Sequence, residues 1–175
     1  MQFLFPALFL LVLILLAGFF AAAELGIMTL NLLKVESEAR RGSRVAQIQL
    51  ALRNKPQRFL STILIGYNVA NITFATYSAK LSLEYIEPHM NAKQALAIAT
   101  LVDVVLVTLF AELIPKTYAA VQSEKLAAFA ARPLFYLDLL LTPVNWLFEK
   151  LVNPILRLMT GGRAIDIHHE PRKRL

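Results

Sequence analysis

The sequence predicts an all-α membrane protein with three transmembrane helices per protomer, accompanied by amphipathic cytoplasmic juxtamembrane and belt helices. The 175 residues are 57% hydrophobic, with a mean hydropathy of +0.56, which is too apolar for an ordinary soluble domain. Residues 3–23 carry no charge at all. An uncharged apolar run of that length is typical of a helix that spans a bilayer.

Charge divides the chain around three spans, which are predicted at about residues 5–30, 58–82 and 95–114. Segment 34–58 has seven Lys and Arg against two Glu, and segment 79–93 has two residues of each sign. From residue 116 onward there are nine basic and five acidic residues. The positive-inside bias therefore places the N-terminus outside and the C-terminus in the cytoplasm of a multi-pass cell (inner) membrane protein.

The basic segment 34–54 alternates apolar and basic residues as an amphipathic helix does, and Gly42-Ser43 is expected to break it. Its position beside membrane helices favours anionic lipid headgroups as its partner, rather than nucleic acid. Residues 161–175 are polar and predict a linker to a cytoplasmic domain, so residues 1–160 form the transmembrane domain.

Apolar segments interrupted by prolines fill residues 123–160. The interruptions at Pro133, Pro143 and Pro154 predict short belt helices that lie along the inner membrane surface or wrap the helix bundle. A fourth and a fifth span would be short, and both the prolines and the charges argue against them.

The second span carries a polar stripe. Asn68 and Asn71 are three residues apart and share a helix face, which Ser61 and Ser78 extend at intervals of seven. Lipid cannot satisfy such groups, so the stripe is expected to face protein or a water-filled cavity. We interpret it as one wall of a cation site.

Three acids lie within the spans. Glu24 lies near the end of the first span. In the same half of the span, Gly18, Ala22 and Gly26 make a smooth helix face that lets another backbone approach closely, either for helix packing alone or as part of the cation site. Asp103 and Glu112 are nine residues apart in the third span, which places them on roughly opposite faces of one regular helix.

Oxygen ligands for a hard cation are available around Pro115. Because proline has no N–H, the carbonyl of Ala111 loses its helical donor next to Glu112. With Asn68, Asn71 and either Ser61 or Thr62, these oxygens suit a partly hydrated Mg²⁺, although K⁺ or Na⁺ accepts the same ligand types.

Catalysis has little support in the sequence. There is no cysteine, no His-Glu-x-x-His pair, no Gly-x-Ser-x-Gly and no phosphate loop, so we expect no enzyme activity. The alternative to transport is a membrane anchor or scaffold for a regulatory domain, in which Asn68 and Asn71 would only join helices through hydrogen bonds.

Three patches, one per span, resemble the transmembrane domain of the CorC/CNNM family of magnesium transporters. They are Phe19-Phe20-Ala21-Ala22-Ala23-Glu24, Ile65-Gly66-Tyr67-Asn68-Val69-Ala70-Asn71 and Phe110-Ala111-Glu112-Leu113-Ile114-Pro115-Lys116. The resemblance covers about residues 1–160. This chain departs from the family pattern at Ala21 and Ala23, where relatives often have serine, at Tyr67, where a smaller polar residue is common, and at Ala111, where glycine is common.

The resemblance implies a homodimer that binds Mg²⁺ among its helices and exports it, coupled to inward Na⁺ movement. It assigns the metal site to Asn68, Asn71 and the carbonyl of Ala111, with Glu112 and Glu24 supporting the site or lining the path. The CBS modules of longer relatives lie outside this sequence.

Overall fold

A computed structural model describes residues 4–85 and 91–159, and within these ranges the chain is helical and has no strand. The elements are α1 (Leu4–Met28), α2 (Leu32–Arg40), α3 (Arg44–Arg53), α4 (Pro56–Tyr85), α5 (Ala92–Leu106), the π-helical segment η2 (Val107–Leu113), α6 (Ile114–Val121), α7 (Ser123–Leu140) and α8 (Thr142–Met159). The all-α prediction is confirmed. The predicted turn at 87–91 and the linker at 161–175 fall almost wholly outside the described residues.

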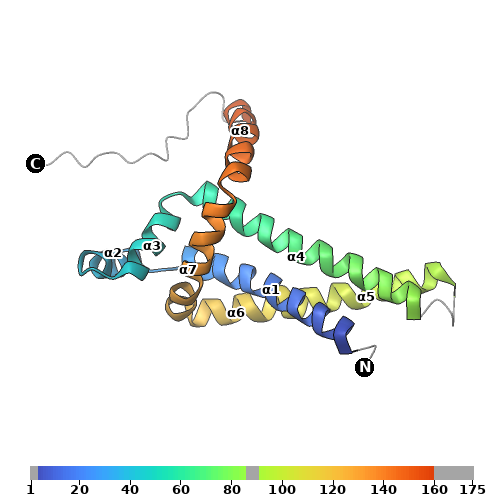
Figure 1. The fold of residues 1–175 in the computed structure, drawn as a ribbon. Helices are drawn as coiled ribbons and strands as arrows, with labels where there is room; N and C mark the ends of the chain where they lie inside the picture. The colour runs from blue at the N-terminus through green and yellow to red at the C-terminus, as the bar shows by residue number, and fades with distance from the viewer. Residues whose placement is uncertain (1–3, 86–90, 160–175) are drawn as a thin grey trace, which may run out of the picture.

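Three helices in the described part of the chain are long and apolar enough to cross a membrane, as predicted. They are Leu4–Met28, Pro56–Tyr85 and the continuous helix Ala92–Val121, which joins α5, η2 and α6. They run side by side, with the start of α1 and the end of α4 at the same end of the bundle (Figure 1). The chain is therefore a multi-pass membrane protein.

Short polar signals set the boundaries of the juxtamembrane helices. The side chains of Asn31 and Ser43 accept hydrogen bonds from the first turns of α2 and α3, as N-cap residues do. Between these two helices, Gly42 has a φ of +92°, a left-handed conformation that glycine adopts without steric cost. The chain thus turns at the predicted break.

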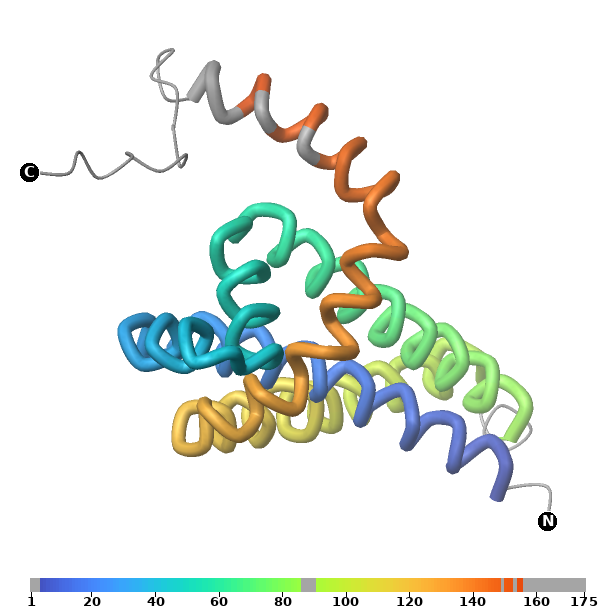
Figure 2. Tube along the Cα trace, turned by 60° about the vertical axis from the view of Figure 1, so that its left-hand side comes forward, coloured from blue at the N-terminus to red at the C-terminus, as the bar shows by residue number. Residues whose placement is uncertain are grey.

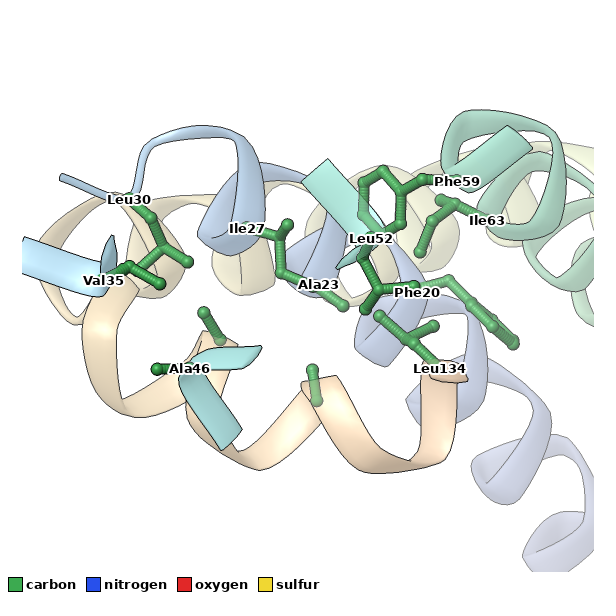
Figure 3. Packing of buried hydrophobic residues seen from close by; sticks show 12 residues of the cluster. Phe20, Ala23, Ile27, Leu30, Val35, Ala46, Leu52, Phe59, Ile63 and Leu134 are labelled. Carbon is green, nitrogen blue, oxygen red and sulfur yellow. The ribbon is translucent and has the colours of Figure 1, made fainter. Parts of the chain in front are cut away.

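One buried apolar cluster packs the juxtamembrane helices against the bundle. Phe20, Ile27, Phe59 and Leu134 belong to it and bring together α1, α4 and α7, while α2 and α3 add smaller side chains (Figure 3). The guanidinium of Arg53 on α3 also donates to two carbonyls at the end of α1, 2.7 and 3.2 Å away. These contacts satisfy carbonyls that a helix end leaves without donors.

The prolines of segment 123–160 break the helices less often than the sequence predicted. Pro133 lies inside α7 and Pro154 inside α8. Pro133 is exposed and removes only the donor to the carbonyl of Phe129, so its helix continues. Within the described residues of this segment, the break falls at Leu141, where the chain bends by 73° and α8 leaves the bundle (Figures 1 and 2).

A polar network fixes this bend against the start of α4. Arg58 Nε donates to Asp138 Oδ1 over 2.9 Å, and Arg58 Nη2 donates to Thr142 Oγ1 over 2.6 Å. Thr62 Oγ1 donates to the same Asp138 oxygen, and Asn145 Nδ2 donates to both Thr62 and Asp138. The network joins α4, α7 and α8 through a single carboxylate.

We expect Asp138→Ala to destabilise the protein by about 2 kcal/mol, because the Arg58 and Asp138 side chains are only 22% and 17% exposed and truncation leaves a part-buried cation without its partner. For a chain of this size, that lowers Tm by about 4–8 °C in detergent. The matched control is Glu124→Ala, which breaks the Lys34 pair, whose side chains are 50% and 58% exposed, and costs less than about 1 kcal/mol. Equal losses in the two variants would contradict this assignment.

Candidate functional site

The second and third sequence patches meet α1 at residues just before its own patch, where α1, α4 and η2 cross. Ala17, Ala70 and Ala111, one from each element, belong to a single buried cluster. Gly18 lies directly against the third patch, since a Cβ placed on it would be 3.0 Å from both the carbonyl oxygen of Phe110 and the ring of Pro115. Small residues therefore bring the backbones of α1 and η2 into contact.

The second patch approaches α1 just as closely. A Cβ on Gly66 would lie 2.3–2.7 Å from ring atoms of Phe20, which is itself buried. Only glycine leaves room for this ring at the α1–α4 contact.

Both acids of the third span are held by α4. The hydroxyl of Tyr67 donates to Glu112 Oε1 over 2.5 Å, and the hydroxyl of Ser78 donates to Asp103 Oδ1 over 2.8 Å. Tyr67 and Ser78 are eleven residues apart, about three turns, so they share one face of α4. The expectation that Asp103 and Glu112 lie on opposite faces of the third span is therefore wrong.

The π-helical segment, which begins after Asp103 and contains Glu112, accounts for this difference. A π turn closes its hydrogen bond over five residues instead of four and so takes up an extra residue. Residues that follow it are rotated by about one position, ~100°, relative to a regular helix. Asp103 precedes the segment Val107–Leu113 and Glu112 lies near its end, so most of this rotation falls between the two acids and turns Glu112 back toward α4.

The same segment changes which carbonyl lacks a donor. The N–H of Ile114 bonds to the carbonyl of Leu109, five residues earlier. In this register the next N–H would serve Phe110, but that position is Pro115 and has none. The sequence predicted a free carbonyl at Ala111, whereas in the π register the N–H missing at Pro115 leaves the carbonyl of Phe110 without its donor, and this carbonyl faces Gly18.

The two asparagine carboxamides of α4 differ in burial. Asn71 follows buried Ala70 and is partly buried at the edge of the inward face, whereas Asn68 is exposed on the flank of the helix. Neither side chain makes a hydrogen bond within residues 4–85 and 91–159. Ser61 lies two turns before Asn68 on the same flank and donates back to the carbonyl of Gln57 over 2.9 Å.

Glu24 is not brought to the same point. It lies seven residues beyond Ala17 on the same face of α1, about 10 Å further along the axis. It is partly buried and forms no ion pair in the described ranges. Those ranges also contain no group of three acidic, His or Cys residues that would hold a metal ion. The candidate site therefore comprises the Tyr67–Glu112 pair, the carbonyl of Phe110 and Asn71 on the neighbouring turn of α4, with the carbonyl of Ala111 as a further candidate from the sequence.

The fold and the candidate site define a class of protein: a helical membrane protein with three spans that carry amide, carbonyl and carboxylate oxygens. Residues 8–172 match the family model described as the cyclin M transmembrane N-terminal domain. The chain belongs to this family.

Individual relatives agree with this assignment. The chain is 33% identical over 151 residues to the UPF0053 inner membrane protein YfjD of Escherichia coli, covering 86% of this chain and 34% of the relative. It is 28% identical over 161 residues to a UPF0053 protein of Haemophilus influenzae (92% and 37%). It is 27% identical over 155 residues to the polyamine export protein of the same organism (83% and 36%). The chain thus spans little more than a third of these relatives.

We expect Gly66→Ala to destabilise the protein by about 1–3 kcal/mol, because the added methyl group overlaps the buried ring of Phe20. Thermal unfolding in detergent measures the change. In a Phe20→Leu background, which removes the ring, the same substitution should cost clearly less. An equal cost in both backgrounds would show that the ring is not the obstacle.

Proposed function

We propose that this domain transports Mg²⁺ through a site between α1, α4 and η2, exporting the ion in exchange for Na⁺ entry. The observation that supports this most directly is the π segment. It packs with α1 and α4 in one buried cluster, and Pro115 leaves the carbonyl of Phe110, two residues before Glu112, without its helical donor. Neutral oxygens with one nearby carboxylate suit a hard cation that keeps part of its water and is released again.

In this proposal Glu112 either binds the ion directly or positions the neighbouring ligands. One of its oxygens accepts the Tyr67 hydroxyl, which fixes the carboxylate relative to α4. Such outer hydrogen bonds orient a ligand and tune its charge. Asn71 and the two carbonyls are the ligands we propose, while Glu24 lines the path toward the basic end of the bundle.

The exposed position of Asn68 supports a homodimer. A carboxamide on the outer flank of a spanning helix cannot be satisfied by lipid. We propose that a second copy, or a water-filled cavity between two copies, covers this flank and that Asn68 completes the site there. The sequence charges orient the N-terminus outside and the C-terminus inside, in the inner membrane named for the Escherichia coli relative.

Two other functions remain in competition. A scaffold needs no free carbonyls or unpaired carboxamides between its spans, and three intramembrane acids favour transport over it. The Haemophilus relative named as a polyamine exporter makes an organic polycation a second candidate cargo. Both are separated from the magnesium proposal by measurement of binding and flux.

Calorimetric titration of Mg²⁺ into the purified chain is the first test. We expect saturable binding that Asn71→Ala weakens by about tenfold or more, through loss of an oxygen ligand. The control Asn54→Ala removes an exposed carboxamide outside the spans and should change nothing. Unchanged Mg²⁺ binding and unchanged Mg²⁺ flux into liposomes with Asn71→Ala would refute the site.

A second variant tests the backbone ligands. Pro115→Ala restores an N–H at position 115 and lets a helical hydrogen bond occupy a carbonyl of Phe110 or Ala111. We expect Mg²⁺ affinity to fall about tenfold. The protein should stay folded, because the substitution adds a backbone hydrogen bond and the only contacts that it removes are those of the Pro115 ring. Circular dichroism checks the fold. Affinity equal to that of the unaltered chain would show that these carbonyls do not bind the ion.

A further inference from the structure

A second polar site lies away from the spans, where α2, α3 and the start of α7 meet. A pocket of about 230 Å³, partly open to its surroundings, is formed there by residues of these helices and the end of α1. None of its lining residues belongs to the cluster around Ala111 and Tyr67. The pocket is therefore separate from the proposed transport site.

Gln49 gives this pocket a side-chain amide without a hydrogen-bond partner among the described residues. Its side chain lines the pocket and is only 5% exposed, yet it makes no hydrogen bond within the described part of the chain. Among the described residues, Asn145 Oδ1 is the one buried side-chain polar atom without a partner, so the amide atoms of Gln49 are still reached from the pocket. Water or a ligand in the pocket satisfies them. The open side of the pocket is the direction from which a ligand reaches this amide.

The pocket lining has one more carboxylate than it has basic groups. Lys34 Nζ donates to Glu124 Oε2 over 2.6 Å, and this hydrogen bond raises the pKa of the Lys34 ammonium above its ordinary value. Glu38 lies one turn after Lys34, lines the pocket and also raises the pKa of Lys34 through its charge, but it makes no direct ion pair in the ranges described. One cation and two carboxylates give the pocket a net charge that attracts a further cation.

The walls decide which kind of cation fits. Leu30 and Val35 line the pocket and are buried parts of the apolar cluster (Figure 3). A bare metal ion needs oxygens on all sides, which two carboxylates and an amide beside apolar walls do not provide. An alkyl ammonium has a charged head for the carboxylate and methylene groups for the walls, as the Lys34 side chain itself has.

We propose that this pocket binds a primary aliphatic ammonium group, with Glu38 and the amide oxygen of Gln49 accepting its hydrogen bonds and Leu30 and Val35 packing on its methylene groups. This site is additional to the transport site and independent of which ion that site carries. The ammonium belongs either to a soluble amine or to the ethanolamine headgroup of a phospholipid.

The test uses n-butylamine, titrated by calorimetry into the purified chain in detergent at low ionic strength, with n-butanol as the neutral analogue of equal length. We expect saturable binding of the amine and none of the alcohol. Glu38→Gln should weaken amine binding about tenfold, the value of one charge-assisted hydrogen bond. Glu36→Gln is the matched control, since it makes the same charge change on α2 outside the pocket lining.

A second variant tests the location. Ala128 is exposed and lines the pocket from α7, so Ala128→Phe fills the space without disturbing the core and should abolish amine binding. Asn71→Ala should leave amine binding intact, which separates this site from the transport site. Amine binding that survives both Glu38→Gln and Ala128→Phe would overturn the proposal. Binding of inorganic phosphate in place of the amine, through Lys34, would overturn it equally.

The source of the ammonium is resolved in nanodiscs. If a phospholipid headgroup fills the pocket, nanodiscs containing phosphatidylethanolamine will compete with n-butylamine, while pure phosphatidylcholine, whose quaternary ammonium cannot donate, will not. If a soluble amine is the ligand, affinity for n-butylamine will be equal in both. Each result supports the ammonium site, and absence of amine binding in both kinds of nanodisc refutes it.

Discussion

Close approach of three backbones is the constraint on which the rest of this structure depends. Gly18 faces the carbonyl of Phe110 and the ring of Pro115, and Gly66 faces the ring of Phe20. Within lipid there is no hydrophobic gain in bringing helices together, so packing of small residues must supply the association. Because these contacts hold α1 against both α4 and η2, the polar groups of the second and third spans come within hydrogen-bond distance of each other.

The π segment is the feature that sequence reasoning could not supply. The all-α fold, three candidate spans and the turn at Gly42 follow from composition, apolar run length and local propensity, which are properties of neighbouring residues. The rotation of Glu112 toward Tyr67 depends on one extra residue in the hydrogen-bond ladder, which changes no residue type. Pro115 is the available signal, since a residue without an N–H makes the register next to it uncertain.

Long-range polar pairing was equally hidden. Arg58 and Asp138 are separated by eighty positions, and each looks like an ordinary interfacial charge in its own segment. Asp138 accepts hydrogen bonds from α4 and α8 within α7, a helix that continues past Pro133 where the sequence predicted an interruption. Local sequence decides where helices form, but the partner of a buried charge is set by how distant helices pack.

The polar groups of the spans separate into two kinds, and the difference argues for function. Asp138, Asp103 and Glu112 each accept a hydrogen bond from a neighbouring helix and so are satisfied within one protomer. Asn68 and Asn71, within the residues that the structure describes, are not. A protein that needed these residues only for packing would pair them as it pairs Asp103 and Glu112, because an unpaired amide in lipid costs free energy and gives nothing in return. Their free amides, together with the carbonyl of Phe110 that Pro115 leaves without a donor, are the kind of ligands that an ion passing between the helices would require.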